Sequence, residues 1–425
     1  MRLPKAAIPL TNPRLRMYLA GNAASAVGTW AQRVVLLWLA WDITQSSFML
    51  GLMAMADLLP SVIVAPFAGS LVDQQDRIRL AYRLQLLSTA PSCIMLMAAM
   101  AGIVSPALLL VAAGLTGILN GFDHPIRMVV VGSIVPREDI PGAVAINSIV
   151  FNLARMLGPA AAGLALTLGT LWLIFVFNAI SYLIFALILS RTYQEPSGNG
   201  QDDNVPDNAT GNKPPSSYWS AIRNGLTGQH KLLLLFFALM ALIYRPIFEL
   251  LPAFADHVAV GEADSARAFS WMTSAQGLGA MIGALLTSVL MTRGTPLSLT
   301  IVFGLLAALS CGLFLISNVL WAALLTLALL SGAILANGIC TQVVLQTQIP
   351  DSLRGKALSL YTMIFRGLPA LGAMAVGVVA DESSERTIFA LGSLPILAML
   401  FILLLALRKE NKTSSFRHPR GNCRN

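Results

Sequence analysis

The chain has 425 residues, of which 56% are hydrophobic and only 11% are charged, and its mean hydropathy is +0.72. A soluble protein of this size cannot bury so much apolar surface, so the composition excludes a soluble enzyme or regulator. The net charge of +8 comes from brief basic clusters between long uncharged runs. Because these runs are too long for barrel strands, they predict a helical protein that crosses a bilayer many times.

The apolar runs predict twelve membrane-spanning helices, each of roughly 20 residues or more. The first six lie near residues 17–41, 47–72, 79–102, 106–128, 142–167 and 170–190. The second six lie near 231–255, 267–291, 297–317, 320–343, 354–380 and 386–407. We therefore expect six-helix bundles at 1–190 and 231–407, a polar linker at 191–230 and a basic tail at 408–425.

The basic residues predict the orientation of the chain. Most of the 28 Lys and Arg residues fall in the termini, the linker and the connections after spans 2, 4, 8 and 10, whereas only Arg267 and Arg386 lie in connections on the other side. The positive-inside rule then places both termini in the cytoplasm and leaves no need to invoke nucleic acid. Tryptophans near the outer ends of spans are expected to form an interfacial belt: Trp38, Trp41, Trp172, Trp271 and Trp321.

The two halves share a pattern of residues. Pro136, Ala143, Gly158 and Gly163 recur 214 positions later as Pro350, Ala357, Gly372 and Gly377. A repeated bundle of this kind suggests alternating access, in which two halves rock about a site near the middle of the membrane. Because the sequence has no phosphate-binding Gly-x-x-x-x-Gly-Lys-Ser/Thr loop, we expect a secondary transporter rather than an ATPase.

Gly69-Ser-Leu-Val-Asp73-Gln-Gln-Asp-Arg77, between spans 2 and 3, resembles the signature loop of the major facilitator superfamily, although Gln74 stands where a basic residue is usual. Phe122-Asp-His-Pro-Ile-Arg127 and Phe151-Asn-Leu-Ala-Arg-Met-Leu-Gly-Pro159 resemble the bacterial exporter branch that includes the enterobactin exporter and macrolide-efflux relatives. This resemblance implies an all-α fold of twelve transmembrane helices in two pseudosymmetric six-helix bundles. It also implies export across the bacterial inner membrane.

The resemblance gives the signature loop a role in gating. It implies that Asp73 contacts the cytoplasmic start of span 11, near Arg354, where a helix amino terminus attracts negative charge. Gly69 and Arg77 belong to the same loop. The alternative is that Asp73 is an ordinary solvated acid.

Four arginines lie inside predicted spans, where each costs at least about 2.5 kcal/mol near the bilayer centre. They form two pairs at nearly the repeat offset: Arg33 with Arg245, and Arg155 with Arg366. The resemblance implies that spans 1 and 7 line a central cavity and that spans 5 and 11 flank the interface between the halves, so all four are expected to point inward. We therefore expect Arg33 and Arg245 to line this cavity, and the alternative is that they only tie helices together.

Arg155 and Arg366 are instead expected to tie helices together. Small residues around them predict close helix contacts and one bend. These residues are Gly158, Pro159, Gly163 and Gly372.

Few acids accompany these arginines. Asp57 lies at about the depth of Arg33, and Glu249 lies one helical turn after Arg245, so that Arg245 and Glu249 are expected to pair. A carboxylate paired with arginine carries protons poorly until the arginine is engaged elsewhere. An anionic substrate that engages the arginine would therefore free an acid for proton antiport. The alternative is a permanent salt bridge that only holds helices together.

At the cytoplasmic end of span 4, Asp123 and Arg127 are four residues apart and are expected to pair as part of a gate. His124 between them is a candidate pH sensor, although an incidental histidine is the simpler interpretation.

These features favour a monomeric proton-driven exporter of a small polar or anionic metabolite. A siderophore is the single substrate most favoured by the resemblance. A macrolide or multidrug efflux pump is one alternative, and a membrane sensor or assembly protein that retains the fold without transport is another. No cofactor, metal site or nucleic-acid partner is expected, because the sequence shows no catalytic constellation and its four cysteines lack metal or disulfide spacing.

Overall fold

The computed structural model describes residues 11–74, 76–192, 225–258, 262–292, 294–380 and 384–415. Several side chains within these ranges, those of 68–74 among them, lie outside the description. Almost all described residues are helical, as the apolar runs predict. The first half holds α1 (Pro13–Thr44), α2 (Ser47–Gln74), α3 (Arg77–Ala101), α4 (Pro106–Ile134), α5 (Ile140–Thr167) and α6 (Trp172–Thr192). The second half holds α8 (Gly228–Ile243), α9 (Leu251–Val258), α10 (Glu262–Leu290), α11 (Pro296–Ile316), α12 (Leu320–Gln348), α13 (Asp351–Ala380) and α14 (Glu385–Ser415).

Within the described part of the chain, eleven helices are long and apolar enough to cross a membrane. The predicted span that falls short of this criterion is the first, although α1 is 32 residues long. Its polar residues explain the difference, because Asn22, Ser25 and Gln32 are buried against other helices rather than exposed to lipid. The all-helical fold predicted from the sequence is confirmed.

The seventh predicted span, 231–255, is not one helix. α8 ends at Ile243, the 3-10 helix η3 covers Arg245–Phe248, and α9 follows. Pro246 explains the break, because proline lacks the amide hydrogen that an α-helix needs and disfavours helical backbone in the residue before it. Residues 246–248 and 251–255, on either side of Glu249, are buried.

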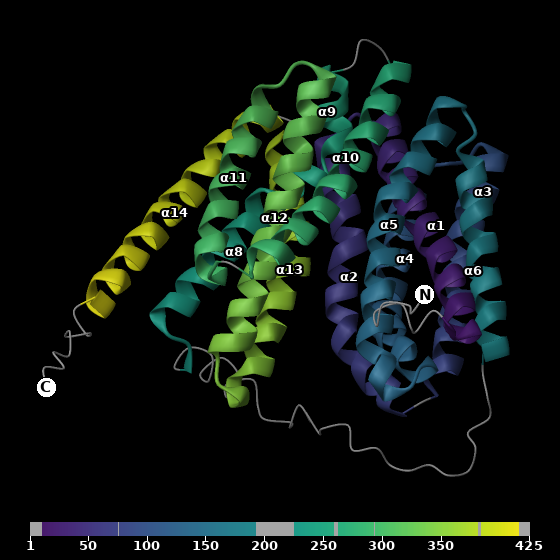
Figure 1. Cartoon of the computed structure of the whole chain (residues 1–425). Helices are drawn as coiled ribbons and strands as arrows, with labels where there is room; N and C mark the ends of the chain where they lie inside the picture. The colour runs from purple at the N-terminus through teal and green to yellow at the C-terminus, as the bar shows by residue number, and fades with distance from the viewer. Residues whose placement is uncertain are drawn as a thin grey trace, which may run out of the picture.

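The helices form two groups that lie side by side, α1–α6 in purple to teal and α8–α14 in green to yellow (Figure 1). We call the end of the protein where α1 begins and α14 ends the terminal face, and the end that holds the turn between α1 and α2 the opposite face. The predicted linker falls largely in 193–224, and much of the predicted tail in 416–425, outside the described residues. α14 continues to Ser415, past its expected end at 407.

Small residues allow helices of the two groups to approach closely. A Cβ on Gly51 of α2 would lie 2.7 Å from the carbonyl oxygen of Ala373 on α13. Gly163 of α5 directly faces Ser270 of α10, with no room for a Cβ between them. Close packing of backbones through glycine is typical of helix contacts in membranes. The α2–α13 and α5–α10 contacts therefore join the two halves.

Candidate functional site

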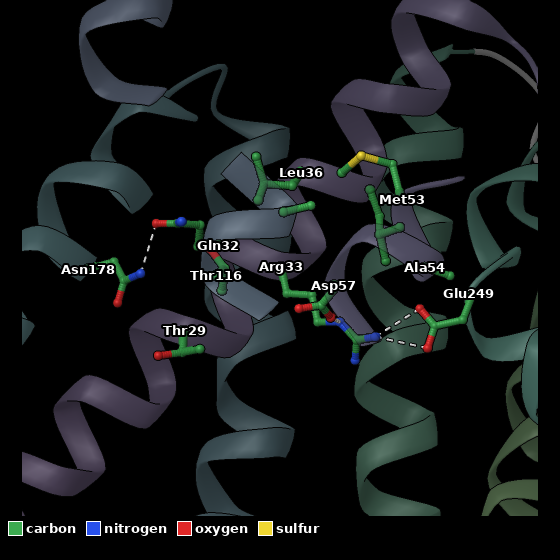
Figure 2. A pocket seen from close by; sticks show the side chains of 12 residues that line it. Thr29, Gln32, Arg33, Leu36, Met53, Ala54, Asp57, Thr116, Asn178 and Glu249 are labelled. Carbon is green, nitrogen blue, oxygen red and sulfur yellow. Dashed lines mark hydrogen bonds and ion pairs between the residues drawn. The ribbon is translucent and has the colours of Figure 1, made fainter. Parts of the chain in front are cut away.

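Arg33 of α1 is shared by two acids from different halves of the chain. Its Nε lies 2.9 Å from Oδ2 of Asp57 on α2, and its Nη2 donates to both carboxylate oxygens of Glu249 at 2.9 and 3.0 Å. The three side chains converge in Figure 2. They are 27%, 16% and 11% exposed, respectively, so this ion triad is largely shielded from solvent. The predicted match in depth between Arg33 and Asp57 is confirmed.

The pairing predicted between Arg245 and Glu249 is wrong. Glu249 follows η3, where the helix break at Pro246 turns it towards Arg33. Arg245 instead donates from Nη1 to the carbonyl oxygen of Phe365 at 2.6 Å, and its guanidinium lies 3.9 Å from the centroid of the Phe365 ring. Arg245 thus ties η3 to α13, and it lines neither of the two cavities that adjoin the triad.

Two cavities meet at the triad, because Arg33 and Asp57 line both. The smaller, of about 400 Å³ including space open to solvent, extends towards the opposite face. The larger, of about 1240 Å³ including space open to solvent, is lined by the terminal-face portions of α1, α2, α4, α5 and α13. Its lining includes many polar groups: Asn22, Thr29, Ser61, Asn120, Asp123, His124, Arg127, Asn147, Ser148, Asn152 and Arg366. A polar cavity of this size can hold a small molecule.

Asp123 and Arg127 form the ion pair predicted from their spacing on α4. Gln85 of α3 donates to Asp123 at 2.7 Å, and Arg127 donates to Asn22 and Ser25 of α1. Each charge therefore has neutral partners as well as its counter-ion, which is what a buried ion pair requires. The pair fixes α1, α3 and α4 within one half rather than joining the two halves.

A second polar layer, which the sequence did not lead us to predict, lies beside the triad on α1. Gln32 Oε1 accepts hydrogen bonds from Ser92 at 2.7 Å and from Asn178 at 2.8 Å. Thr29 contacts the hydroxyl of Tyr182 at 2.7 Å. The spacing of polar residues along α1 at 22, 25, 29, 32 and 33 places them on one helical stripe, and this signal would have indicated the layer.

The second pair of predicted arginines has two different environments. Arg155 of α5 lies with its guanidinium 5.5 Å from the centroid of Trp30, which Arg33 also approaches at 5.6 Å. Arg366 of α13 lines the larger cavity. Among the described residues, Arg366 has no hydrogen bond or ion pair, so the bracing role expected for Arg366 is wrong.

The other packing residues lie within single halves. Gly158 and Pro159 of α5 are buried, and a Cβ on Gly158 would lie 2.9 Å from the carbonyl oxygen of Val27 on α1. A Cβ on Gly372 of α13 would lie 2.6 Å from Cγ of Pro246. Both positions allow close helix contact, as predicted, but within a half.

The signature loop is only partly described. Gly69 and Asp73 fall in the last turns of α2, and their side chains lie outside the description, so the proposed contact of Asp73 with the start of α13 stays a prediction. Arg77 begins α3 and is exposed, and Arg354 is half-buried near the start of α13.

Polar contacts join the two halves at the opposite face. Trp41 of α1 donates from Nε1 to Oδ2 of Asp256 on α9 at 2.7 Å, and Ser47 donates to Glu385 at 2.6 Å. Trp38 stacks on Phe269 of α10 at 5.8 Å. These contacts close the opposite face. They also show that Trp38 and Trp41, expected in a lipid-facing belt, are instead buried.

Replacing Asp256 by Ala is expected to open the opposite face more often. The change leaves the indole N–H of Trp41 without its acceptor, which costs about 1–3 kcal/mol in the closed state, or roughly 5- to 150-fold in the population ratio. Spin-label distances across this face would report the shift. Asp256→Asn retains an acceptor oxygen and serves as the control, and unchanged distances in Asp256→Ala would refute a role for this contact.

The fold and site define a membrane transporter of the major facilitator type: two groups of membrane-spanning helices enclose a polar cavity with shared charges at its end. A model of the transmembrane secretion effector family matches residues 5–420, so the chain belongs to this family. The family is one of transporters, and the sensor or assembly alternative is set aside.

Two relatives carry named activities. The chain is 26% identical over 165 residues to the staphyloferrin A transporter of Staphylococcus aureus, a match that covers 38% of this chain and 41% of that protein. It is 25% identical over 420 residues to the multidrug efflux pump Tap of Mycolicibacterium fortuitum, covering 91% of this chain and 94% of the pump. The first match thus spans less than half of either protein, and the second nearly all of both.

Solved structures support the fold alone. The nucleoside transporter NupG (D323A mutant) superposes with a TM-score of 0.74 at 12% identity, covering 92% of this chain and 99% of that one. A bacterial homologue of the iron transporter ferroportin gives a TM-score of 0.68 at 15% identity, covering 92% of this chain and 98% of that one. Both likenesses extend over nearly the whole of each chain.

Proposed function

We propose that this protein exports a small polar or anionic metabolite, with a siderophore as the favoured substrate, in exchange for protons. The observation that carries the proposal is the ion triad, in which one arginine of the first half holds an acid of its own half and an acid of the other. Any rocking of the halves changes the distance between Arg33 and Glu249, whereas Arg33 and Asp57 move together. A change of conformation therefore breaks or reforms the ion pair between Arg33 and Glu249.

The proposed cycle begins in the conformation described, closed at the opposite face, with Glu249 ionised against Arg33. Substrate enters the larger cavity from the terminal face. When the halves rock and the opposite face opens, Glu249 leaves Arg33 and takes a proton from the outer solution, because an unpaired carboxylate is costly within a membrane. After substrate release the halves return, the Arg33–Glu249 pair reforms, and the proton leaves to the terminal side.

We place the terminal face in the cytoplasm of a bacterium, with the protein a monomer in the inner membrane. The distribution of Lys and Arg supports this orientation, since the basic termini and linker belong to that side. In this orientation the larger cavity loads from the cytoplasm, as export requires. Treating intact cells with a membrane-impermeant reagent that labels either terminus of the protein would test the orientation.

The pairing of charges in the cavity supports a polar or anionic substrate. Of the three arginines that line the larger cavity, Arg33 pairs with Asp57 and Glu249 and Arg127 pairs with Asp123, whereas Arg366 has no acid partner among the described residues. The similarity to the staphyloferrin A transporter supports a siderophore among the anionic candidates. A pump for cationic compounds would be expected to show the opposite balance of charge.

The proposed identity of the substrate is tested by deleting the gene and assaying culture supernatants for iron chelators. We expect less chelator outside the cells and more inside them, with recovery when the intact gene is returned. Equal extracellular chelator in the deletion strain and its parent would rule out siderophore export.

Multidrug efflux is retained as a second candidate because the match to the efflux pump Tap covers nearly the whole chain. The two candidates differ in the charge of the compounds moved. Ethidium as a cationic probe and staphyloferrin A as an anionic probe, compared in the same inside-out vesicles, would separate them. Transport of ethidium alone would favour the drug pump.

A further inference from the structure

Arg366 and His124 face the same cavity from opposite halves of the protein, and neither has a role in the cycle proposed above. Arg366 belongs to α13 and His124 to α4, and both line the larger cavity. They are within electrostatic range of each other. Each is half-buried. Among the described residues, neither makes a hydrogen bond or an ion pair with the protein.

The other charged groups of this cavity are already satisfied. Arg33 holds Asp57 and Glu249, and Arg127 holds Asp123. An arginine shielded from solvent without a counter-ion is costly, and its planar fork of donors suits a carboxylate that binds through two hydrogen bonds. The cavity therefore offers an anion one unengaged guanidinium, at Arg366.

The other residues that line the larger cavity indicate what else the ligand carries. Asn120 lies one helical turn before His124 on α4 and lines the same cavity, as does Asn152 on α5. Amide side chains bind hydroxyl and carbonyl groups. Trp30 and Phe151 form an aromatic wall, with their rings 6.2 Å apart edge to face. The lining thus suits a carboxylate that carries further oxygen groups.

We propose that Arg366 is the anchor for a carboxylate of the substrate, with His124 as a second donor from the other half. This inference rests on the proposed export function and names the chemical class of its substrate as hydroxylated carboxylates. A carboxylate between α4 and α13 bridges the two halves on the terminal side. The anion also compensates the charge of Arg366, which makes no ion pair among the described residues, so the loaded carrier closes this face more readily than the empty one.

The test uses citrate as a hydroxylated tricarboxylate probe and its neutral trimethyl ester as the matched control. Binding to the purified protein is followed by calorimetry for the wild type, Arg366→Gln and Arg366→Lys. We expect citrate but not its ester to bind the wild type, roughly tenfold or greater loss of affinity in Arg366→Gln, and partial recovery in Arg366→Lys. Arg267→Gln removes an exposed arginine near the opposite face and is expected to bind citrate as the wild type does.

Equal affinity of the wild type and Arg366→Gln for citrate, or equal binding of citrate and its ester, would overturn the inference. So would the absence of citrate binding to the wild type. These outcomes are separate from those for the export cycle. If citrate binding depends on Arg366 but transport shows no proton exchange, the antiport proposal alone is contradicted. If Arg366→Gln keeps both proton exchange and full affinity for citrate, this inference alone is contradicted.

Discussion

Glutamine at position 249 is expected to abolish proton-driven transport while leaving downhill exchange of substrate intact. The amide retains the shape of the protonated acid and can still accept a hydrogen bond from Arg33, but it cannot take up or release a proton. The carrier should therefore continue to alternate without coupling to the gradient. Fluorescence recovery of a pH-sensitive dye in energised inside-out vesicles, on addition of staphyloferrin A, would measure the loss.

Two comparisons make this result specific. Asp264→Asn alters an exposed acid that pairs with Arg267 on α10, and it should transport as the wild type does. Asp57→Asn alters the acid that stays with Arg33 in the same half, and we expect weaker coupling rather than none. A full dye response in Glu249→Gln would remove Glu249 from the proton pathway.

Removing the carboxylate of Asp123 is expected to destabilise the protein by about 3–5 kcal/mol, because Asp123→Ala leaves Arg127 charged and shielded from solvent without a counter-ion. Asn22, Ser25 and Gln85 contact Arg127 but are neutral, so they cannot replace the lost charge. The midpoint of thermal unfolding of the purified protein, followed by tryptophan fluorescence, would register the loss.

A paired substitution distinguishes charge from packing at this site. Asp123→Asn together with Arg127→Gln removes both charges and retains polar groups of similar size, so it should destabilise less than Asp123→Ala alone. If the paired variant unfolds earlier than the single one, the loss would come from packing and not from the unpaired arginine.

Much of the fold follows from the sequence because the bilayer imposes simple rules. A run of about 20 apolar residues has to be a helix, and the proline and glycine positions shared by the two halves indicate the repeat. The pairing of Asp123 with Arg127 follows equally directly, since residues four apart share a helical face. Arg33 and Asp57 were matched by depth alone, counted from the ends of their spans.

The partner of Glu249 was beyond this kind of argument. Its prediction assumed a continuous helix from 231 to 255, and the break at Pro246 alters which way every later side chain points. The roles predicted for Arg245 and Arg366 are wrong for a related reason. Each has a counterpart in the first half, but the contact of Arg245 with the Phe365 carbonyl depends on packing between η3 and α13, which no local sequence pattern encodes.

The direct measurement of the central claim is the proton-to-substrate ratio in proteoliposomes, obtained from the pH gradient at which net substrate flux reverses. The account predicts that wild-type flux reverses at a gradient corresponding to at least about one proton per substrate molecule. In the double variant Asp57→Asn/Glu249→Gln, the reversal point should not depend on the pH gradient. A double variant with the wild-type ratio would contradict the account, because the proton would then travel by groups other than those held by Arg33.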